Sequence, residues 1–149
     1  ILLGREGIHE SLLDWALDVS QFKREVESFP QGLDTQVGTR GMSISGGQKQ
    51  RLGLARALVG RPKLLILDDC TSALDAGTES ALWERLHEVL PDMTAVIISH
   101  RPDTLERVDA IYVLKDGEVV ERGRHSQLVA QGGEYAQMYR RYVLEESVV

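Results

Sequence analysis

The sequence predicts an α/β fold built around a parallel sheet. Two short apolar runs, residues 64–67 and 95–98, have the length and composition of strands. A helical pattern over about residues 78–90 separates them, and strands that alternate with helices favour parallel pairing. Because the first run is wholly apolar, we expect it to be buried on both faces. Polar residues follow each run, at the edge where α/β proteins bind ligands.

Helices are expected before the first of these strands. Apolar residues recur at helical spacing over residues 8–17, and a second piece continues the pattern over residues 22–29. A third helix is expected over residues 45–58, where Gly60 and Pro62 stop it. The first part of the chain is therefore predicted to be helical.

The C-terminal part predicts a hairpin followed by helices. A short helix near Asp103 leads to a third apolar run, residues 110–114. The Asp-Gly pair at 116–117 joins this run to residues 119–120, which is the pattern of a β-hairpin. We expect the hairpin to add antiparallel strands at one edge of the sheet. Residues 125–144 predict two helices parted by a Gly-Gly pair.

Composition is that of one ordinary globular domain. The chain has 149 residues, 42% hydrophobic and 27% charged, with a formal net charge of −6. An acidic balance argues against a protein that coats nucleic acid, because phosphate binding relies on basic surface. The single cysteine excludes an intrachain disulfide. No apolar run approaches the roughly 18 residues that a membrane-spanning helix needs.

Two aspartates close the first predicted strand. Asp68 ends the apolar run, and a carboxylate there is a candidate Mg²⁺ ligand, usually through water. Asp69 follows it and is a candidate for orienting an attacking water, because successive strand residues face opposite ways until the chain turns. The alternative is that these carboxylates only cap the next turn. Taken alone, the pattern leaves both interpretations open.

The segment Ser45-Gly46-Gly47-Gln48 opens a predicted helix. Two glycines let a ligand approach the backbone closely, and the free N–H groups and dipole of a helix start attract anions. The alternative is that Ser45 is an ordinary N-cap. Residues 41–46 are not a complete phosphate-binding loop, because the lysine and hydroxyl of Gly-x-x-x-x-Gly-Lys-Ser/Thr are missing after them.

A histidine follows the second predicted strand. His100 lies just past the run 95–99, on the same expected sheet edge as Asp68. From there it could hydrogen-bond a terminal phosphate or an attacking water. A lone histidine after a strand is more often structural, and its parallel placement with Asp68 is what favours a catalytic role.

Together these residues resemble the nucleotide-binding domain of ABC transporters. Residues 44–51 resemble the signature motif, with Ile44 at its usual leucine position. Residues 64–69 resemble the Walker B strand, residues 72–75 the D-loop, and His100 the switch histidine. Two longer segments also resemble exporter-type domains. They are the loop before the signature and the C-terminal tail, residues 32–41 and 123–139.

The resemblance implies a P-loop NTPase (ABC ATPase) core with a parallel sheet, plus an α-helical signature subdomain. Residues 1–60 would form the helical subdomain, and residues 61–149 the C-terminal part of the α/β core. The Walker A loop, the aromatic residue that stacks on adenine and the Q-loop glutamine would precede Ile1, so the N-terminal Walker A part is expected to be absent here. An exporter's transmembrane domain would lie further upstream.

In the family, two such domains face each other head to tail and trap two ATP molecules. The resemblance implies that the signature binds the ATP held mainly by the partner, through Ser45, Gly46, Gly47 and Gln48. Asp68 would serve Mg²⁺ and His100 the γ-phosphate in the chain's own site. Ser72 and Asp75 would reach the partner and couple the two sites. Implied partners are a second nucleotide-binding domain, identical or different, and a transmembrane domain, but no nucleic acid. The chain itself would lie at the cytoplasmic face of the cell membrane, as part of a transporter.

One residue departs from the family pattern. Asp69 stands where the family normally has a catalytic glutamate, and it is shorter by one methylene. Because a misplacement of about 1 Å can cost on the order of 10²-fold in rate, our hypothesis is a degenerate site that hydrolyses ATP slowly. That pattern resembles one half of a heterodimeric exporter, whose partner supplies the glutamate.

Two alternatives to an exporter ATPase remain open at this point. One is an ABC-type ATPase that acts on DNA or on ribosomes, against which the acidic charge and the exporter-like tail count. The other is that these 149 residues, taken by themselves, are an inactive structural fragment. Without Walker A they are expected neither to bind ATP tightly nor to hydrolyse it.

Overall fold

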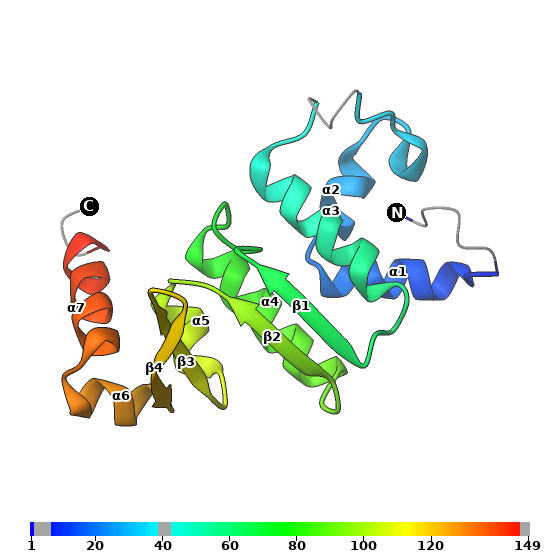
Figure 1. Ribbon diagram of the computed structural model, residues 1–149. Helices are drawn as coiled ribbons and strands as arrows, with labels where there is room; N and C mark the ends of the chain where they lie inside the picture. The colour runs from blue at the N-terminus through cyan, green and yellow to red at the C-terminus, as the bar shows by residue number, and fades with distance from the viewer. Residues whose placement is uncertain (2–6, 39–42, 147–149) are drawn as a thin grey trace. The chain divides into compact units, whose positions relative to one another are not determined.

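The computed structural model describes residue 1 and residues 7–38 and 43–146 (Figure 1). The chain divides into two compact units, residues 1–98 and 99–149. Residues 39–42, part of the loop predicted before the signature, lie outside the described residues. The division of the chain at residues 60 and 61 into a helical subdomain and a core stays a prediction.

The first unit combines helices with two strands. The helices before the strands are α1 (Glu10–Val19), α2 (Lys23–Ser28), the short 3₁₀ helix η1 (Gly32–Asp34) and α3 (Gly46–Leu58). Strand β1 (Leu64–Asp68), helix α4 (Ala76–Val89) and strand β2 (Thr94–Ile98) follow. The strands pair in parallel, with Leu64 opposite Thr94 and Asp68 opposite Ile98. The predicted α/β fold with a parallel sheet is confirmed.

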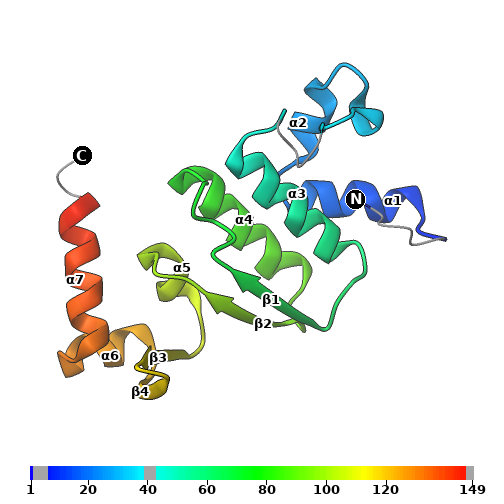
Figure 2. The same ribbon diagram turned by 45° about the horizontal axis from the view of Figure 1, so that its top comes forward.

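The core of this unit lies on one face of the strand pair. Buried residues of α1, α3 and α4 pack there against Leu65 and Leu67 of β1. Figure 2 shows α4 running along the strands, and α1 and α3 beyond it. Ion pairs also join helices of this unit: Arg85 of α4 binds Asp18 of α1 at 2.9 Å, and Arg51 of α3 binds Glu25 of α2.

Burial of β1 on both faces was expected, and that expectation is wrong. Leu65 and Leu67 are buried, whereas Leu64 and Ile66 are 52% and 65% exposed. In β2, Val96 and Ile98 are about half exposed. The described helices of this unit cover only one face of the pair.

The second unit pairs a hairpin with three helices. It contains α5 (Pro102–Arg107), β3 (Ile111–Lys115), β4 (Glu118–Gly123), α6 (His125–Gln131) and α7 (Glu134–Glu146). The predicted hairpin is confirmed: Asp116 and Gly117 have φ of +52° and +84°, and positive values at both central residues are what a type I′ turn requires. The two predicted C-terminal helices are also present, parted by Gly132 and Gly133.

The hairpin was expected at an edge of the parallel sheet, and this is not observed. Within the described chain, β3 and β4 form a separate two-stranded sheet. The Asp-Gly turn fixes the pairing of its own two strands only, and it carries no information about a third strand beside them. The hairpin instead helps to form a small core around Leu105, Ile111, Leu128 and Tyr135.

Glu121 of β4 ties this core to the start of α7. Its carboxylate accepts hydrogen bonds from the backbone N–H groups of Glu134 at 2.6 Å and Tyr135 at 3.0 Å. An acidic side chain at a helix start satisfies free donors and complements the helix dipole. None of the helices in the described part of the chain is long and apolar enough to span a bilayer.

Candidate functional site

The first turn of α3 combines an N-cap with free backbone donors. Ser45 Oγ accepts from Gln48 N at 3.2 Å, and Gln48 Oε1 accepts from Ser45 N at 2.9 Å, which is a capping box. The N-cap interpretation of Ser45 is therefore confirmed. The N–H groups of Gly46 and Gly47 have no partner among the described residues. They lie at the positive end of the helix dipole, which is suited to an anion.

Gly47 lies so close to a neighbouring loop that only glycine fits. A Cβ placed there would come within 2.8 Å of the carbonyl oxygen of Ala73 and 3.4 Å of Leu74 Cδ2. A Cβ on Gly46 would meet Ala73 Cβ at an ordinary 3.5 Å. The first turn of α3 is thus packed directly against the loop that follows β1.

That loop begins at the two predicted aspartates. Asp68 is the exposed last residue of β1, and Asp69 has φ of +46°. The N–H of Asp69 donates to Ile98 O at 3.0 Å. Because the chain turns at Asp69 itself, the alternation of side chains along the strand does not extend to it. Both carboxylates are solvent-exposed, as ligand-binding groups at a sheet edge need to be.

Gln50 is the residue of this site that sequence reasoning missed. Its Nε2 donates to Ser72 Oγ at 2.8 Å and to Asp69 O at 3.1 Å, and its Oε1 accepts from Ala73 N at 3.0 Å. One signal could have pointed to it: Gln50 lies three residues after Gly47, so the two share a helix face. The partners, 19 to 23 residues away in sequence, could not be found from that spacing.

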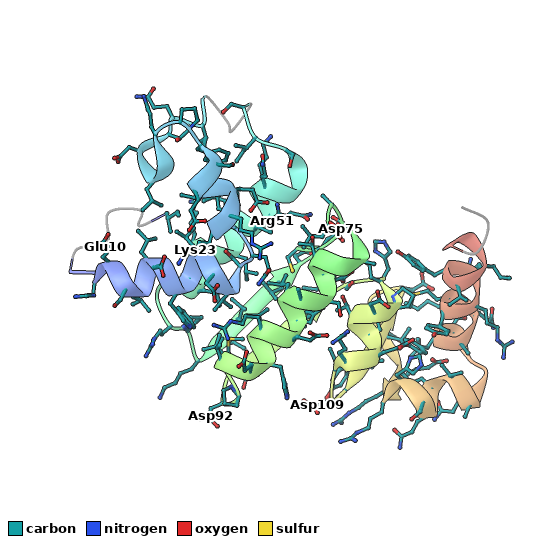
Figure 3. All side chains as sticks on the ribbon, turned by 180° about the vertical axis from the view of Figure 1, so that it is seen from behind. Glu10, Lys23, Arg51, Asp75, Asp92 and Asp109 are labelled. Atoms are coloured by element: carbon teal, nitrogen blue, oxygen red, sulfur yellow. The ribbon has the colours of Figure 1, made fainter. Side chains whose placement is uncertain are left out.

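The two predicted D-loop residues have partners within their own chain. Ser72 Oγ donates to Asp69 O at 3.1 Å. Asp75 is the N-cap of α4, where Oδ1 accepts from Thr78 N at 2.9 Å and Oδ2 from Thr78 Oγ1 at 2.7 Å. These two bonds, the backbone one first, lower the pKa of the Asp75 carboxyl. Figure 3 shows Asp75 at the start of α4.

Replacing Asp75 by alanine is expected to lower the melting temperature by a few degrees, because α4 loses its cap. Asp75→Asn keeps an acceptor and serves as the matched control. Since the native pKa of Asp75 is lowered, its charge stabilises the fold above the ordinary aspartate pKa of about 3.9, and this contribution disappears as the pH falls through the native value. Calorimetric melts of the three proteins between pH 7 and pH 3 measure both effects. A wild-type stability no more acid-sensitive than that of Asp75→Asn would contradict the second.

His100 lies in the second unit, just before α5. Its ring is exposed and lies 5.9 Å from that of Tyr142, between centroids, at a tilt of 54°. It comes two residues after Ile98, the register partner of Asp68. The expected placement of His100 and Asp68 on one edge stays a prediction.

The donor set around Asp68 fits one kind of metal ion. No group of three or more His, Cys, Asp or Glu side chains within residues 7–38 and 43–146 could hold a metal by itself. The Asp68 carboxylate makes no hydrogen bond or ion pair there. Mg²⁺ commonly takes one or two carboxylates and completes its shell with water and substrate phosphates. A single free carboxylate therefore fits Mg²⁺ that arrives with a nucleotide.

Comparison with known proteins identifies the fold. Residues 10–72 match the family model described as ABC transporter. The structure of a bacterial Atm1-family ABC exporter with ATP bound superimposes on 93% of this chain with a TM-score of 0.88, at 38% identity. The fold and the matched residues are those of an ABC transporter nucleotide-binding domain. The P-loop ABC ATPase class predicted from the sequence is confirmed.

Relatives of this chain in sequence also carry the names of transporters. ABC transporter B family member 14 of Arabidopsis thaliana is 44% identical over 91% of the chain. The ATP-dependent lipid A-core flippase of Vibrio cholerae serotype O1 is 50% identical over 77% of the chain. The chain spans only 11% and 20% of these two relatives, and 24% of the exporter of known structure.

Proposed function

We propose that the full-length protein is an ABC exporter and that this domain helps to convert ATP binding and hydrolysis into transport. The observation that carries the proposal is the pair of free N–H groups at the start of α3, packed against the loop of Asp68 and Asp69. The N–H groups at the start of α3 are suited to a phosphate, and the carboxylates of Asp68 and Asp69 are suited to a nucleotide that carries a metal ion. The exporter of known structure was solved with ATP bound, which supports the assignment.

In this proposal, ATP binds across a head-to-tail pair of domains. The first turn of α3, from Ser45 to Gln48, would contact the γ-phosphate of the ATP that the partner domain holds. The first N–H groups of a helix have no partner within the helix, so they are available to donate hydrogen bonds to an anion such as a phosphate. The Gln48 side chain already accepts a hydrogen bond from Ser45 N, so it would stabilise the conformation of this first turn. Either a second copy or a different domain could be the partner.

The other site residues would serve the ATP of the chain's own site. Asp68 would bind Mg²⁺, which neutralises charge on the phosphates, and His100 would hydrogen-bond the γ-phosphate. Asp69 would orient the attacking water, poorly because of its length. Ser72 and Asp75 would contact the partner from the loop that they shape here. A transmembrane domain would place the whole at the cytoplasmic face of the cell membrane.

Asp68→Asn tests the proposal most directly. In the full-length protein we expect Mg²⁺-dependent ATP hydrolysis to fall at least about 100-fold, because an amide holds Mg²⁺ far less well than a carboxylate. Asp92→Asn is the matched control, since Asp92 is an exposed aspartate in the turn before β2. This substitution is expected to leave the rate of ATP hydrolysis unchanged. Equal loss in both variants, or no loss in Asp68→Asn, would contradict the role of Asp68.

The alternative of an ATPase that acts on DNA or on ribosomes is not favoured. The relatives at 41–50% identity carry names of transporters and flippases. The inactivity of the isolated 149 residues stays a prediction.

A further inference from the structure

The Gln50 side chain joins the first turns of α3 to the loop after β1. Its carboxamide uses both ends: the nitrogen donates to Asp69 O and Ser72 Oγ, and the oxygen accepts from Ala73 N. The loop is short and is fixed at three points by one side chain.

The contact at Gly47 strengthens this joint. Gly47 lies against the carbonyl oxygen of Ala73, whose own N–H is bonded to Gln50. Gly47 and Gln50 lie one helical turn apart, so one face of α3 holds the loop by packing and by hydrogen bonds together. A shift of the loop would have to break both sets of contacts.

The backbone of the loop after β1 is strained at Asp69. Asp69 adopts φ of +46°, a conformation that costs an L-residue energy unless the surroundings hold it. Its N–H is bonded to Ile98 of β2, and its carbonyl oxygen accepts from both Ser72 and Gln50. The direction of the Asp69 side chain therefore depends on bonds that Gln50 helps to make.

We propose that Gln50 is a positioning residue for ATP hydrolysis, which fixes Asp69 and Ser72 relative to the first turn of α3 in the same chain. This turn, residues 45–48, is called the signature turn below. The inference rests on the proposed function. The signature turn would serve the partner's ATP and Asp69 the chain's own. A rigid joint between them makes the two sites move together, because displacement of α3 at one site is transmitted to the attacking-water position at the other.

Gln50→Met in the full-length protein tests this role, since methionine keeps the length of the side chain and removes all three bonds. We expect kcat for ATP hydrolysis to fall about 10-fold, because small displacements of a reacting group are costly. KM for ATP should change by less than about 2-fold, because the donors of Gly46 and Gly47 are retained. Gln50→Glu can still accept from Ala73 N but loses both bonds that the Gln50 nitrogen donates, so it should restore only part of kcat.

Two measurements separate positioning from general stability. Gly53→Ala lies on the same helix, where an added Cβ meets nothing within 4 Å, and it should leave kcat unchanged. Hydrogen exchange of the Ala73 amide should speed up in Gln50→Met and not in Gly53→Ala, because only the first removes the acceptor of that N–H.

The outcomes distinguish the two proposals. Lower kcat with unchanged KM and faster exchange at Ala73 would support the role of Gln50. Faster exchange with unchanged kcat would overturn that role and leave the proposed function intact. If the unsubstituted protein and Gly53→Ala hydrolysed no ATP, the proposed function itself would be overturned, and the role of Gln50 with it.

Discussion

Full-length protein carrying Asp69→Glu is expected to hydrolyse ATP about 10- to 100-fold faster than the unsubstituted protein. The reason is the length of the side chain, because glutamate extends the carboxylate by one methylene toward the position of the attacking water. A misplacement of a reacting group by about 1 Å can cost on the order of 10²-fold in rate. Asp69 is exposed, so the longer side chain meets no packed core.

The same substitution should carry a small stability cost. Asp69 has φ of +46°, and aspartate tolerates this region better than most residues because its short side chain bonds locally. Glutamate lacks that advantage, and we expect a loss of less than about 1 kcal/mol. A gain in rate together with a loss in stability would mark the position as a functional one.

Asp116→Glu is the matched control for this experiment. Asp116 is also an aspartate with positive φ, +52°, but it lies in the hairpin turn. It should show the same small loss of stability and no gain in rate. Single-turnover ATP hydrolysis and thermal melts of the three proteins make the comparison. A hydrolysis rate in Asp69→Glu no higher than in the unsubstituted protein would refute the hypothesis of a degenerate site.

Local signals in the sequence predicted local structure well. Ser45 was considered as an N-cap, and it is the N-cap of α3, where Gln48 completes a capping box. The Asp116-Gly117 pair predicted a hairpin, and positive φ at both residues explains why those two residue types are needed. In each case the determining contacts span only a few residues.

Predictions that depended on distant neighbours fared differently. A four-residue apolar run does not reveal whether one or both faces are covered, and β1 exposes Leu64 and Ile66. The three bonds of Gln50 join segments 19 to 23 residues apart, and no periodicity links them. The left-handed backbone of Asp69 likewise depends on its bond to β2. The sequence supplies candidate site residues, whose roles stay predictions, but it does not reveal the hydrogen bonds of Gln50 that hold the loop between them.

Gly47→Ala should have the largest effect of the three Gly→Ala substitutions that α3 allows. The new Cβ would stand 2.8 Å from Ala73 O and 3.4 Å from Leu74 Cδ2, and backbone cannot rotate out of the way as a side chain does. Overpacking of this kind costs about 1–3 kcal/mol. The shift would also separate the signature turn from the loop of Asp69, so ATP hydrolysis should fall about 100-fold.

Three glycines of α3 form an internal series for this test. Gly53→Ala adds a methyl group in open space and should raise stability by about 0.5–1 kcal/mol, because alanine favours helix more than glycine. Gly46→Ala makes an ordinary 3.5 Å contact with Ala73 Cβ, and its effect should be intermediate. Melting temperature and ATPase rate should therefore both follow the order Gly53, Gly46, Gly47. If Gly47→Ala were as stable and active as Gly53→Ala, the close packing of the signature turn on the loop would not exist in solution, and the coupling argued from Gln50 would lose its physical basis.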